Sequence, residues 1–215
     1  MSNGFFITLE GIEGCGKTTQ ARLLGEYLKG KSRDVLLTRE PGGTAIGGRI
    51  REILLDPASS GMDSRAELLL YFADRAQHVA EVIEPALADG AVVVCDRFAD
   101  ATTAYQGFGR GLELELIAEL NEAATRGLMP DLTLLLDLPV EEGLKRARKR
   151  NGDNNQGREG RFEDEPDKFH EKVRQGYLSI ASCETGRFKV IDASGAPEEV
   201  QAAIRNIVKL PFQTR

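Results

Sequence analysis

Short apolar runs rich in β-branched residues alternate along the chain with segments whose apolar residues recur at helical spacing. Such short runs are typical of buried strands, and the longer periodic segments are typical of helices packed on a sheet. The pattern therefore predicts an α/β fold in which helices cover a parallel sheet. We expect strands at Phe5–Leu9, Val35–Thr38, Ala91–Cys95, Leu132–Asp137 and Phe188–Ile191. We expect helices at Lys17–Lys29, Ile46–Leu54, Asp63–Ala88, Glu113–Arg126, Val140–Arg150, Pro166–Cys183 and Glu198–Lys209.

The chain is expected to form one domain over residues 1–215. We find no internal repeat and no linker that would divide it, and this length suits a single α/β core. One low-complexity stretch, Asn151–Gly160, is polar and rich in Gly and Asn, and it is flanked by basic residues. It predicts a surface loop inserted into the domain.

Composition restricts the partners and the location. The 28 basic and 34 acidic residues give a formal charge of −6, which argues against a broad surface for nucleic acid. The apolar runs are far too short to cross a bilayer, and the first residues lack the basic segment of a targeting peptide. The three cysteines have neither metal-ligand nor disulfide spacing. We therefore expect a cytoplasmic protein that binds neither membrane nor nucleic acid.

Residues 11–18 match the pattern G-x-x-x-x-G-K-[ST] in full, between an expected strand and an expected helix. Glycines let the backbone turn so that its N–H groups point at phosphate oxygens, and the following helix adds the positive end of its dipole. Lys17 can reach the β and γ phosphates of ATP, and the Thr18 hydroxyl can hold Mg²⁺. The expected nucleotide-binding residues are Gly11, Ile12, Glu13, Gly14, Cys15, Gly16, Lys17, Thr18 and Thr19.

A phosphate-binding loop alone predicts a nucleotide and not a reaction. The base-reading Asn-Lys-x-Asp sequence of signalling GTPases is absent, which leaves a small kinase with a second phosphorylated ligand. Arg39 follows one expected strand and could bind an acceptor phosphate, since ligands gather at the carboxyl ends of parallel strands. Asp96 follows another strand, where it would organise the metal, and Arg97 beside it could bind or polarise the acceptor phosphate.

Phe72 and Arg75 are neighbours on one face of the expected helix Asp63–Ala88. Together they could supply an aromatic platform and a hydrogen-bond donor for a nucleobase. Phe72 also belongs to the apolar stripe of that helix, so pattern alone favours core packing over a base platform. A basic group around the polar loop has the composition of a closing lid with an arginine for the transferred phosphate. Its members are Arg146, Arg148, Arg150, Arg158 and Arg161.

Taken in order, these segments resemble the thymidylate kinase family, and the resemblance covers nearly the whole chain. The motifs that carry it are the phosphate-binding loop, Arg39–Gly43, Tyr71–Arg75, Asp96–Phe98, Thr102–Gly107 and the Arg-rich lid. The resemblance implies a three-layer α/β/α P-loop NTPase fold with a five-stranded parallel sheet and a small lid, about residues 148–162. It also implies transfer of the ATP γ-phosphate to dTMP with Mg²⁺, by a homodimer.

The resemblance further implies roles for individual residues. Phe72 would stack on thymine, Arg75 would bond a ring carbonyl, Thr102 would lie near N3, and Tyr105 would exclude a ribose hydroxyl at C2′. The implied acceptor residues are Glu13, Arg39, Pro41, Phe72, Arg75, Arg97, Thr102, Tyr105 and Gln106.

The phosphate-binding loop contains no arginine, as in the bacterial type of the family, so the lid must supply the catalytic cation. Arg161 is the first candidate, followed by Arg158 and Arg150. The expected catalytic set is Lys17, Asp96, Arg97, Arg158 and Arg161, with Thr18 and Asp96 at the metal. Two alternatives stay open: a kinase of another nucleotide or deoxynucleoside, and a regulatory P-loop protein without acceptor chemistry.

Overall fold

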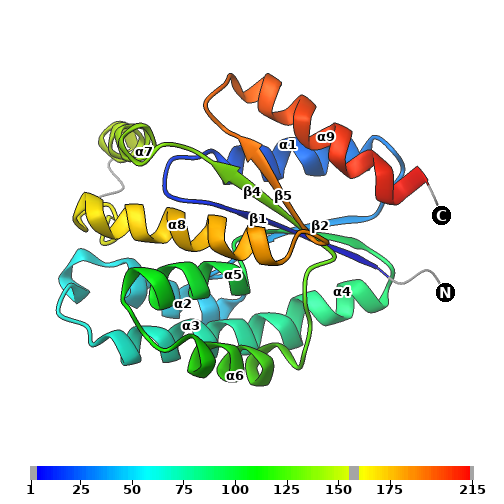
Figure 1. Ribbon diagram of the computed structural model, residues 1–215. Coiled ribbons are helices and arrows are strands. Elements are labelled where there is room, and N and C mark those ends of the chain that lie inside the picture. Colours follow the sequence, from blue (N-terminus) through cyan, green and yellow to red (C-terminus); the bar gives the residue numbers. More distant parts are fainter. Residues whose placement is uncertain (1–3, 155–159, 214–215) are drawn as a thin grey trace.

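The computed structural model describes residues 4–154 and 160–213. Its centre is one parallel sheet of five strands in the order β2-β3-β1-β4-β5, shown in Figure 1. The strands are β1 Phe5–Glu10, β2 Val35–Arg39, β3 Val92–Asp96, β4 Leu132–Asp137 and β5 Phe188–Asp192. All four strand pairs are parallel, so the predicted α/β fold class and its five-stranded sheet are confirmed.

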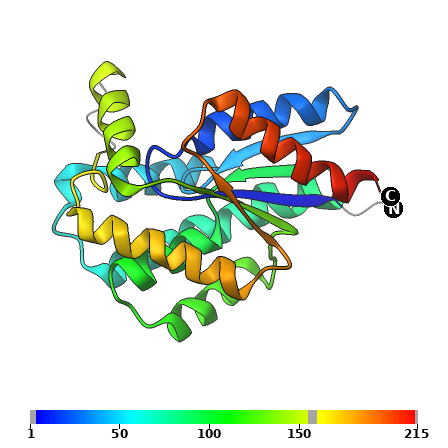
Figure 2. The ribbon, with the colours of Figure 1, turned by 45° about the horizontal axis from the view of Figure 1, so that its top comes forward.

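Helices cover both faces of the sheet (Figures 1 and 2). Helices α1 (Lys17–Lys29) and α9 (Pro197–Gln213) lie on one face, and α3, α4, α5 and α8 lie on the other. Side chains of β1 alternate between the two layers, because successive residues of a strand point to opposite faces. Ile7 packs in the core beneath α1 and α9, whereas Phe6 packs in the core on the opposite face.

The helices on the second face and at the sheet edge agree with the predicted segments to within a few residues, except for α5, which was not predicted. They are α2 Ala45–Leu55, α3 Ser64–His78, α4 Glu84–Ala88, α5 Ala99–Thr102, α6 Leu114–Thr125, α7 Val140–Asn154 and α8 Asp167–Cys183. The described residues also include a short 3₁₀ helix at Pro57–Ser59 and two π-helical segments, Val79–Ile83 and Thr103–Gly109.

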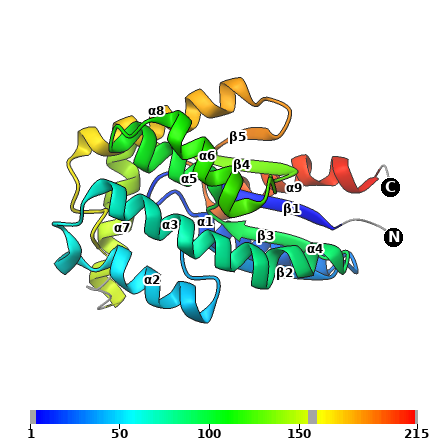
Figure 3. The same cartoon turned by 90° about the horizontal axis from the view of Figure 1, so that it is seen from below.

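The long helix expected at Asp63–Ala88 is one continuous rod with a wide turn in it, seen from below in Figure 3. The π turn Val79–Ile83 separates α3 from α4, and the Glu84 N–H bonds to the Val79 carbonyl. Pro85 follows directly. A proline has no N–H and clashes with the carbonyl four residues before it, so a wider turn here accommodates the ring without ending the helix.

The loops that follow β1, β2 and β3 all lie at the carboxyl edge of the sheet. The loop after β1 packs backbone to backbone against α7. A Cβ atom at Gly14 would lie 2.0 Å from the Gly143 carbonyl oxygen, and Gly14 has φ +71°, so only glycine fits there. The edge therefore brings three loops and the start of α7 around one site. Among the described residues, no helix has the length and apolarity to cross a membrane.

Candidate active site

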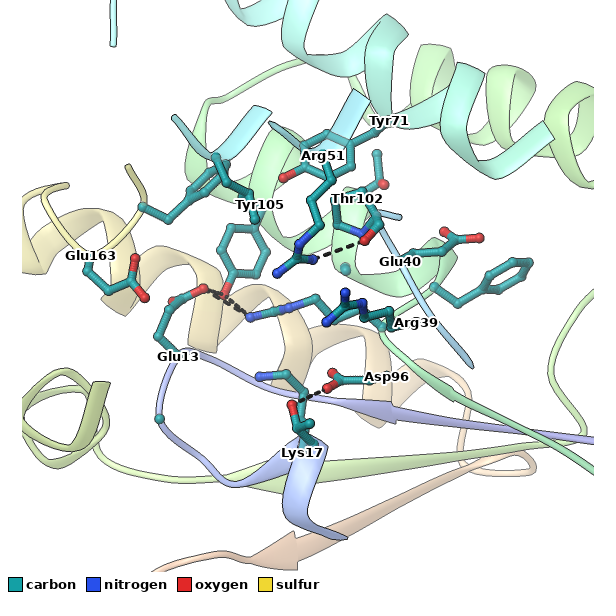
Figure 4. Close-up of a pocket in the computed structure, with 18 of the residues that line it drawn as sticks. Glu13, Lys17, Arg39, Glu40, Arg51, Tyr71, Asp96, Thr102, Tyr105 and Glu163 are labelled. Atoms are coloured by element: carbon teal, nitrogen blue, oxygen red, sulfur yellow. Dashed lines mark hydrogen bonds and ion pairs between the residues drawn. The ribbon is translucent and has the colours of Figure 1, made fainter. Parts of the chain in front are cut away.

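One cavity of about 590 Å³ opens at the carboxyl edge of the sheet, between the phosphate-binding loop and α3 (Figure 4). It holds residues from both halves of the predicted site. Of the residues predicted from the sequence, the cavity is lined by Glu13, Gly14, Gly16, Lys17, Thr18, Thr19, Arg39, Pro41, Arg75, Asp96, Arg97, Thr102, Tyr105 and Gln106. The donor loop and the acceptor residues thus share one space.

The phosphate-binding loop forms because its glycines accept backbone angles that other residues avoid. Gly11, Gly14 and Gly16 all have positive φ. The Lys17 ammonium group folds over this loop and donates hydrogen bonds to the carbonyl oxygens of Gly11 (3.0 Å) and Ile12 (2.8 Å). Gly11, Ile12 and Cys15 are buried and shape the loop without lining the cavity. The cation is therefore held beside the loop whose N–H groups would bind phosphate.

Thr18 and Asp96 meet across the first turn of α1. The Thr18 hydroxyl donates to Asp96 Oδ2 at 2.6 Å, although the two residues are far apart in the sequence. A hydroxyl and a carboxylate side by side match the oxygen ligands that Mg²⁺ takes from proteins that bind phosphates. This pair fits the predicted metal position.

Arg97 connects the phosphate-binding loop with the acceptor side. Its Nη1 donates to the Gly11 carbonyl at 3.0 Å, and its Nη2 donates to Glu13 Oε1 and to the Tyr105 hydroxyl, both at 3.0 Å. Arg97 also has φ +71°, a left-handed backbone conformation that is costly for a residue with a side chain. Its side chain is thereby aimed from the end of β3 into the cavity.

Glu13 is the anion at this junction. Burial alone would raise its pKa, but His170, Arg97 and Lys17 together hold the pKa of this carboxyl well below its ordinary value. Tyr105 donates its hydroxyl to Glu13 Oε1, and His170 Nδ1 lies 3.2 Å from Glu13 Oε2. Figure 4 shows the Tyr105 hydroxyl pointing at the Glu13 carboxylate on one wall of the cavity. An ionised carboxylate and a phenol side by side can form hydrogen bonds with a sugar hydroxyl.

Two adjacent aromatic residues of α3 have different environments. Phe72 is 6% exposed and packs with Leu68 and Ile117 in a small core between α3 and α6. Tyr71, one position earlier, lines the cavity and is labelled in Figure 4. The placement does not fit the prediction that Phe72 is the base platform, because consecutive residues of a helix point about 100° apart. Tyr71 is the aromatic residue on the cavity wall.

Arg161 also lies elsewhere than a catalytic lid residue would. It is 5% exposed and does not line the cavity. Its guanidinium pairs with Glu67, and its Nη1 donates to the Leu54 carbonyl at 3.0 Å, so it ties the end of the predicted lid to α2 and α3. Arg158 lies outside the described residues. Among the predicted basic residues, Arg146 and Arg150 line the cavity.

Several lining residues were not predicted. Glu40, Tyr71, Phe98 and Phe162 lie within the motifs but were given no role, and the others lie outside every motif. Arg51 on α2 donates to the Pro41 carbonyl at 3.0 Å and points into the cavity (Figure 4). Glu163, after the lid, pairs with Arg150. Helical spacing from Pro41 could not have identified Arg51, because the contact depends on how α2 folds back over the loop. The further lining residues are Glu40, Leu55, Tyr71, Phe98, Ala101 and Phe162.

A phosphate-binding loop, a paired threonine and aspartate, and a second group of arginines around one cavity define a P-loop nucleotide phosphotransferase with an acceptor site. Comparison with known proteins gives the family. The family model "Thymidylate kinase" matches residues 9–204, and this chain belongs to the thymidylate kinase family.

Similar proteins extend over almost the whole chain. A thymidylate kinase of Geotalea daltonii is 59% identical over 206 residues, covering 95% of this chain and 96% of that protein. One of Desulfovibrio desulfuricans is 54% identical over 211 residues, covering 98% and 97%. The crystal structure of thymidylate kinase from Ehrlichia chaffeensis superposes with a TM-score of 0.78 at 34% identity, covering 96% of this chain and 99% of that one. The resemblance predicted from the motifs is confirmed.

Proposed function

We propose that this chain transfers the γ-phosphate of ATP to dTMP and so produces dTDP. The observation that carries the proposal is the shared cavity, in which Lys17 of the donor loop and the acceptor-side arginines Arg39 and Arg97 line one space. Phosphoryl transfer requires the two phosphates to be held in line and their charge to be neutralised. A nucleotide switch without acceptor chemistry has no need for the second group of arginines.

The donor side consists of the phosphate-binding loop and Lys17. Backbone N–H groups of the loop bind the phosphates. The Lys17 ammonium group moves from the carbonyl oxygens of Gly11 and Ile12 to the β and γ phosphates. Thr18 and Asp96 would hold Mg²⁺, which supplies charge neutralisation for the phosphates. Arg146 and Arg150 line the same cavity and add further positive charge around the phosphates.

The acceptor side has separate residues for the phosphate, the sugar and the base. Arg39 and Arg97 bind the dTMP phosphate, which is largely dianionic and therefore needs no general base. Tyr105 and Glu13 contact the deoxyribose, where Tyr105 leaves no room for a 2′-hydroxyl. Arg75 on α3 donates to the base, and the Tyr71 ring provides the aromatic face. Thr102 and Gln106 line the cavity beside them and complete the acceptor site.

A homodimer and a cytoplasmic location complete the proposal. Helices α2 and α3 pack together, and they leave Ile46, Ile53 and Leu69 at 53%, 49% and 56% exposure. Ile46 and Ile53 are seven residues apart and share a helix face, which suits a second copy of the chain. Sedimentation of wild type and of an Ile53→Glu variant tests this surface. The location follows from the cytoplasmic supply of ATP and deoxynucleotides.

A coupled ADP-release assay tests the function directly. ATP and Mg²⁺ are supplied with dTMP, dUMP, dCMP, dAMP, dGMP or UMP, each in turn. We expect rapid turnover with dTMP and little with UMP, because Tyr105 excludes a ribose. Preference for another monophosphate would support the alternative of a different nucleotide kinase. Tight ATP binding without any acceptor-stimulated turnover would support the regulatory alternative.

A further inference from the structure

Arg75 is fixed from several sides although it lines the acceptor part of the cavity. Its side chain is 1% exposed, and its Nε donates to Glu40 Oε2 at 2.9 Å. Its Nη2 donates to the Phe98 carbonyl at 3.0 Å and to the Thr102 hydroxyl at 2.9 Å, and its Nη1 donates to Asn121 Oδ1 at 3.2 Å. These contacts leave one Nη1 hydrogen of the five N–H donors for a ligand. The direction in which this hydrogen points depends on the contacts that fix the orientation of the guanidinium group.

Behind Arg75, a buried chain of polar groups continues away from the cavity. Glu40 uses its second oxygen, Oε1, to contact His78 Nδ1 at 2.9 Å. His78 Nε2 in turn lies 2.6 Å from the Thr38 hydroxyl. His78 is fully buried and Glu40 is 4% exposed, so water does not compete for these contacts. These hydrogen bonds connect Thr38 of strand β2, through His78 at the end of α3 and then Glu40, to the guanidinium group of Arg75.

The proton positions in this chain follow from the chemistry of its members. A carboxylate only accepts hydrogen bonds, so His78 Nδ1 carries the proton that points at Glu40. The Thr38 hydroxyl can then donate to Nε2 of a neutral ring. Glu40 thereby selects the Nδ1–H tautomer of His78, the Thr38 hydroxyl holds the ring at Nε2, and His78 in turn orients the carboxylate that holds Arg75.

The loop after β2 is built closely around this ring. A Cβ atom at Gly43 would lie 2.3 Å from His78 Nε2, so the loop reaches this position only because Gly43 has no side chain. On the next turn of α3, Asp74 Oδ1 accepts the Gly42 N–H at 3.0 Å. The loop that presents Arg39 and Glu40 to the cavity is therefore seated on the last turn of α3.

We propose that His78 is a positioning residue for recognition of the acceptor base. It does not line the cavity, and it acts through Glu40, whose oriented carboxylate holds the Arg75 guanidinium toward the base. The inference rests on the proposed function, because it takes the ligand of Arg75 to be the base of the acceptor nucleotide. Loss of the Nδ1 donor weakens acceptor binding and leaves the donor side unchanged.

Two substitutions distinguish the effect of losing the Nδ1 donor to Glu40 from the effect of losing the imidazole ring itself. In His78→Asn the side-chain amide occupies the position of Nδ1 and can still donate to Glu40. In His78→Gln the amide reaches the position of Nε2 and loses that contact. We expect His78→Gln to raise the KM for dTMP about tenfold, the effect of losing one hydrogen bond to a charged group. The kcat and the KM for ATP should stay near wild type, and His78→Asn should restore most of the acceptor affinity.

The control is Gln77→Ala, since Gln77 adjoins His78 on α3 but its side-chain amide donates to the exposed Glu81. Equal acceptor KM values for the two His78 variants, whether normal or raised, would overturn the proposal, as would a larger loss in His78→Asn. If His78→Gln does not fold, Thr38→Val removes the hydrogen bond that holds the ring at Nε2 and replaces no residue that lines the cavity. Its acceptor KM should rise about threefold, a fraction of the full effect, and an unchanged value would overturn the proposal. Turnover of the wild type with the acceptor panel tests the function separately.

Discussion

Tyr71 and Arg75 lie one helical turn apart on α3, and both line the acceptor side of the cavity. Residues four apart share a helix face, so an aromatic ring and a guanidinium group are presented together. Phe72 points instead into the small core formed with Leu68 and Ile117. Binding and packing are thus assigned to two adjacent aromatic residues.

Substitution of these two residues should affect different properties. Tyr71→Ala should raise the KM for dTMP about tenfold or more, because stacking on a base is worth about 1–3 kcal/mol. Phe72→Ala should lower the free energy of unfolding by about 3–5 kcal/mol through the cavity it leaves. Acceptor kinetics and urea unfolding measure the two effects, with Tyr71→Phe as the control that keeps the ring. A raised KM for dTMP in a stable Phe72→Ala, together with a normal KM in Tyr71→Ala, would instead make Phe72 the base platform.

Lys17→Ala should lower kcat by about 10²–10³-fold, because an electrostatic clamp on the transferred phosphate is lost. The matched control is Lys29→Ala at the other end of α1, where the lysine is exposed. Steady-state ADP release measures both variants. Turnover of Lys17→Ala within about tenfold of wild type would show that the loop does not act as a phosphate clamp.

Arg161→Ala should mainly destabilise the protein. Its partner Glu67 is fully buried and would lose one charged neighbour while Arg110 stays paired with it, and losing one such hydrogen bond costs about 1.5–3 kcal/mol. Arg150→Ala, at a residue that lines the cavity and is half exposed, should lower kcat with little change in stability. Thermal unfolding and turnover of both variants decide between these roles. An Arg161→Ala variant that is stable but inactive would support the original prediction that Arg161 is catalytic.

The stability of the protein should fall as pH rises from about 5 to 9. Burial, together with the charge of Asp100, raises the pKa of Glu10 from 4.5 to about 8. The folded state therefore holds a proton that the unfolded state has already lost, and this contribution is complete below 4.5 and disappears as pH rises through about 8. The loss should be on the order of 5 kcal/mol.

Glu10→Gln supplies the comparison, since it keeps an acceptor for the Phe98 N–H but cannot ionise. Urea unfolding of both proteins across this pH range measures the two slopes. We expect a flatter profile for Glu10→Gln, and parallel profiles would show that another group controls the pH dependence.

The sheet could be predicted because each buried strand is an apolar run with clear ends, so the five expected strands agree with the structure to within about a residue. The donor loop was also predicted, since its chemistry lies in consecutive residues. The helical pattern favours core packing for Phe72, and the family resemblance assigns it to the base instead. The role of Tyr71 could not be predicted, because α6 decides which of the two rings is buried and its position depends on tertiary packing. Arg161 could not be placed for the same reason: its partner Glu67 lies 94 residues away.

Glu13 belongs to the loop that receives the donor, yet its carboxylate contacts Arg97 and Tyr105 on the acceptor side. A small molecule that displaces this carboxylate from within the acceptor cavity will also distort the donor loop. Because coupling between two binding sites is reciprocal, such an inhibitor should lower the affinity for ATP and should lose potency as ATP rises. Resistance through substitution of Glu13 would weaken the enzyme for both of its substrates.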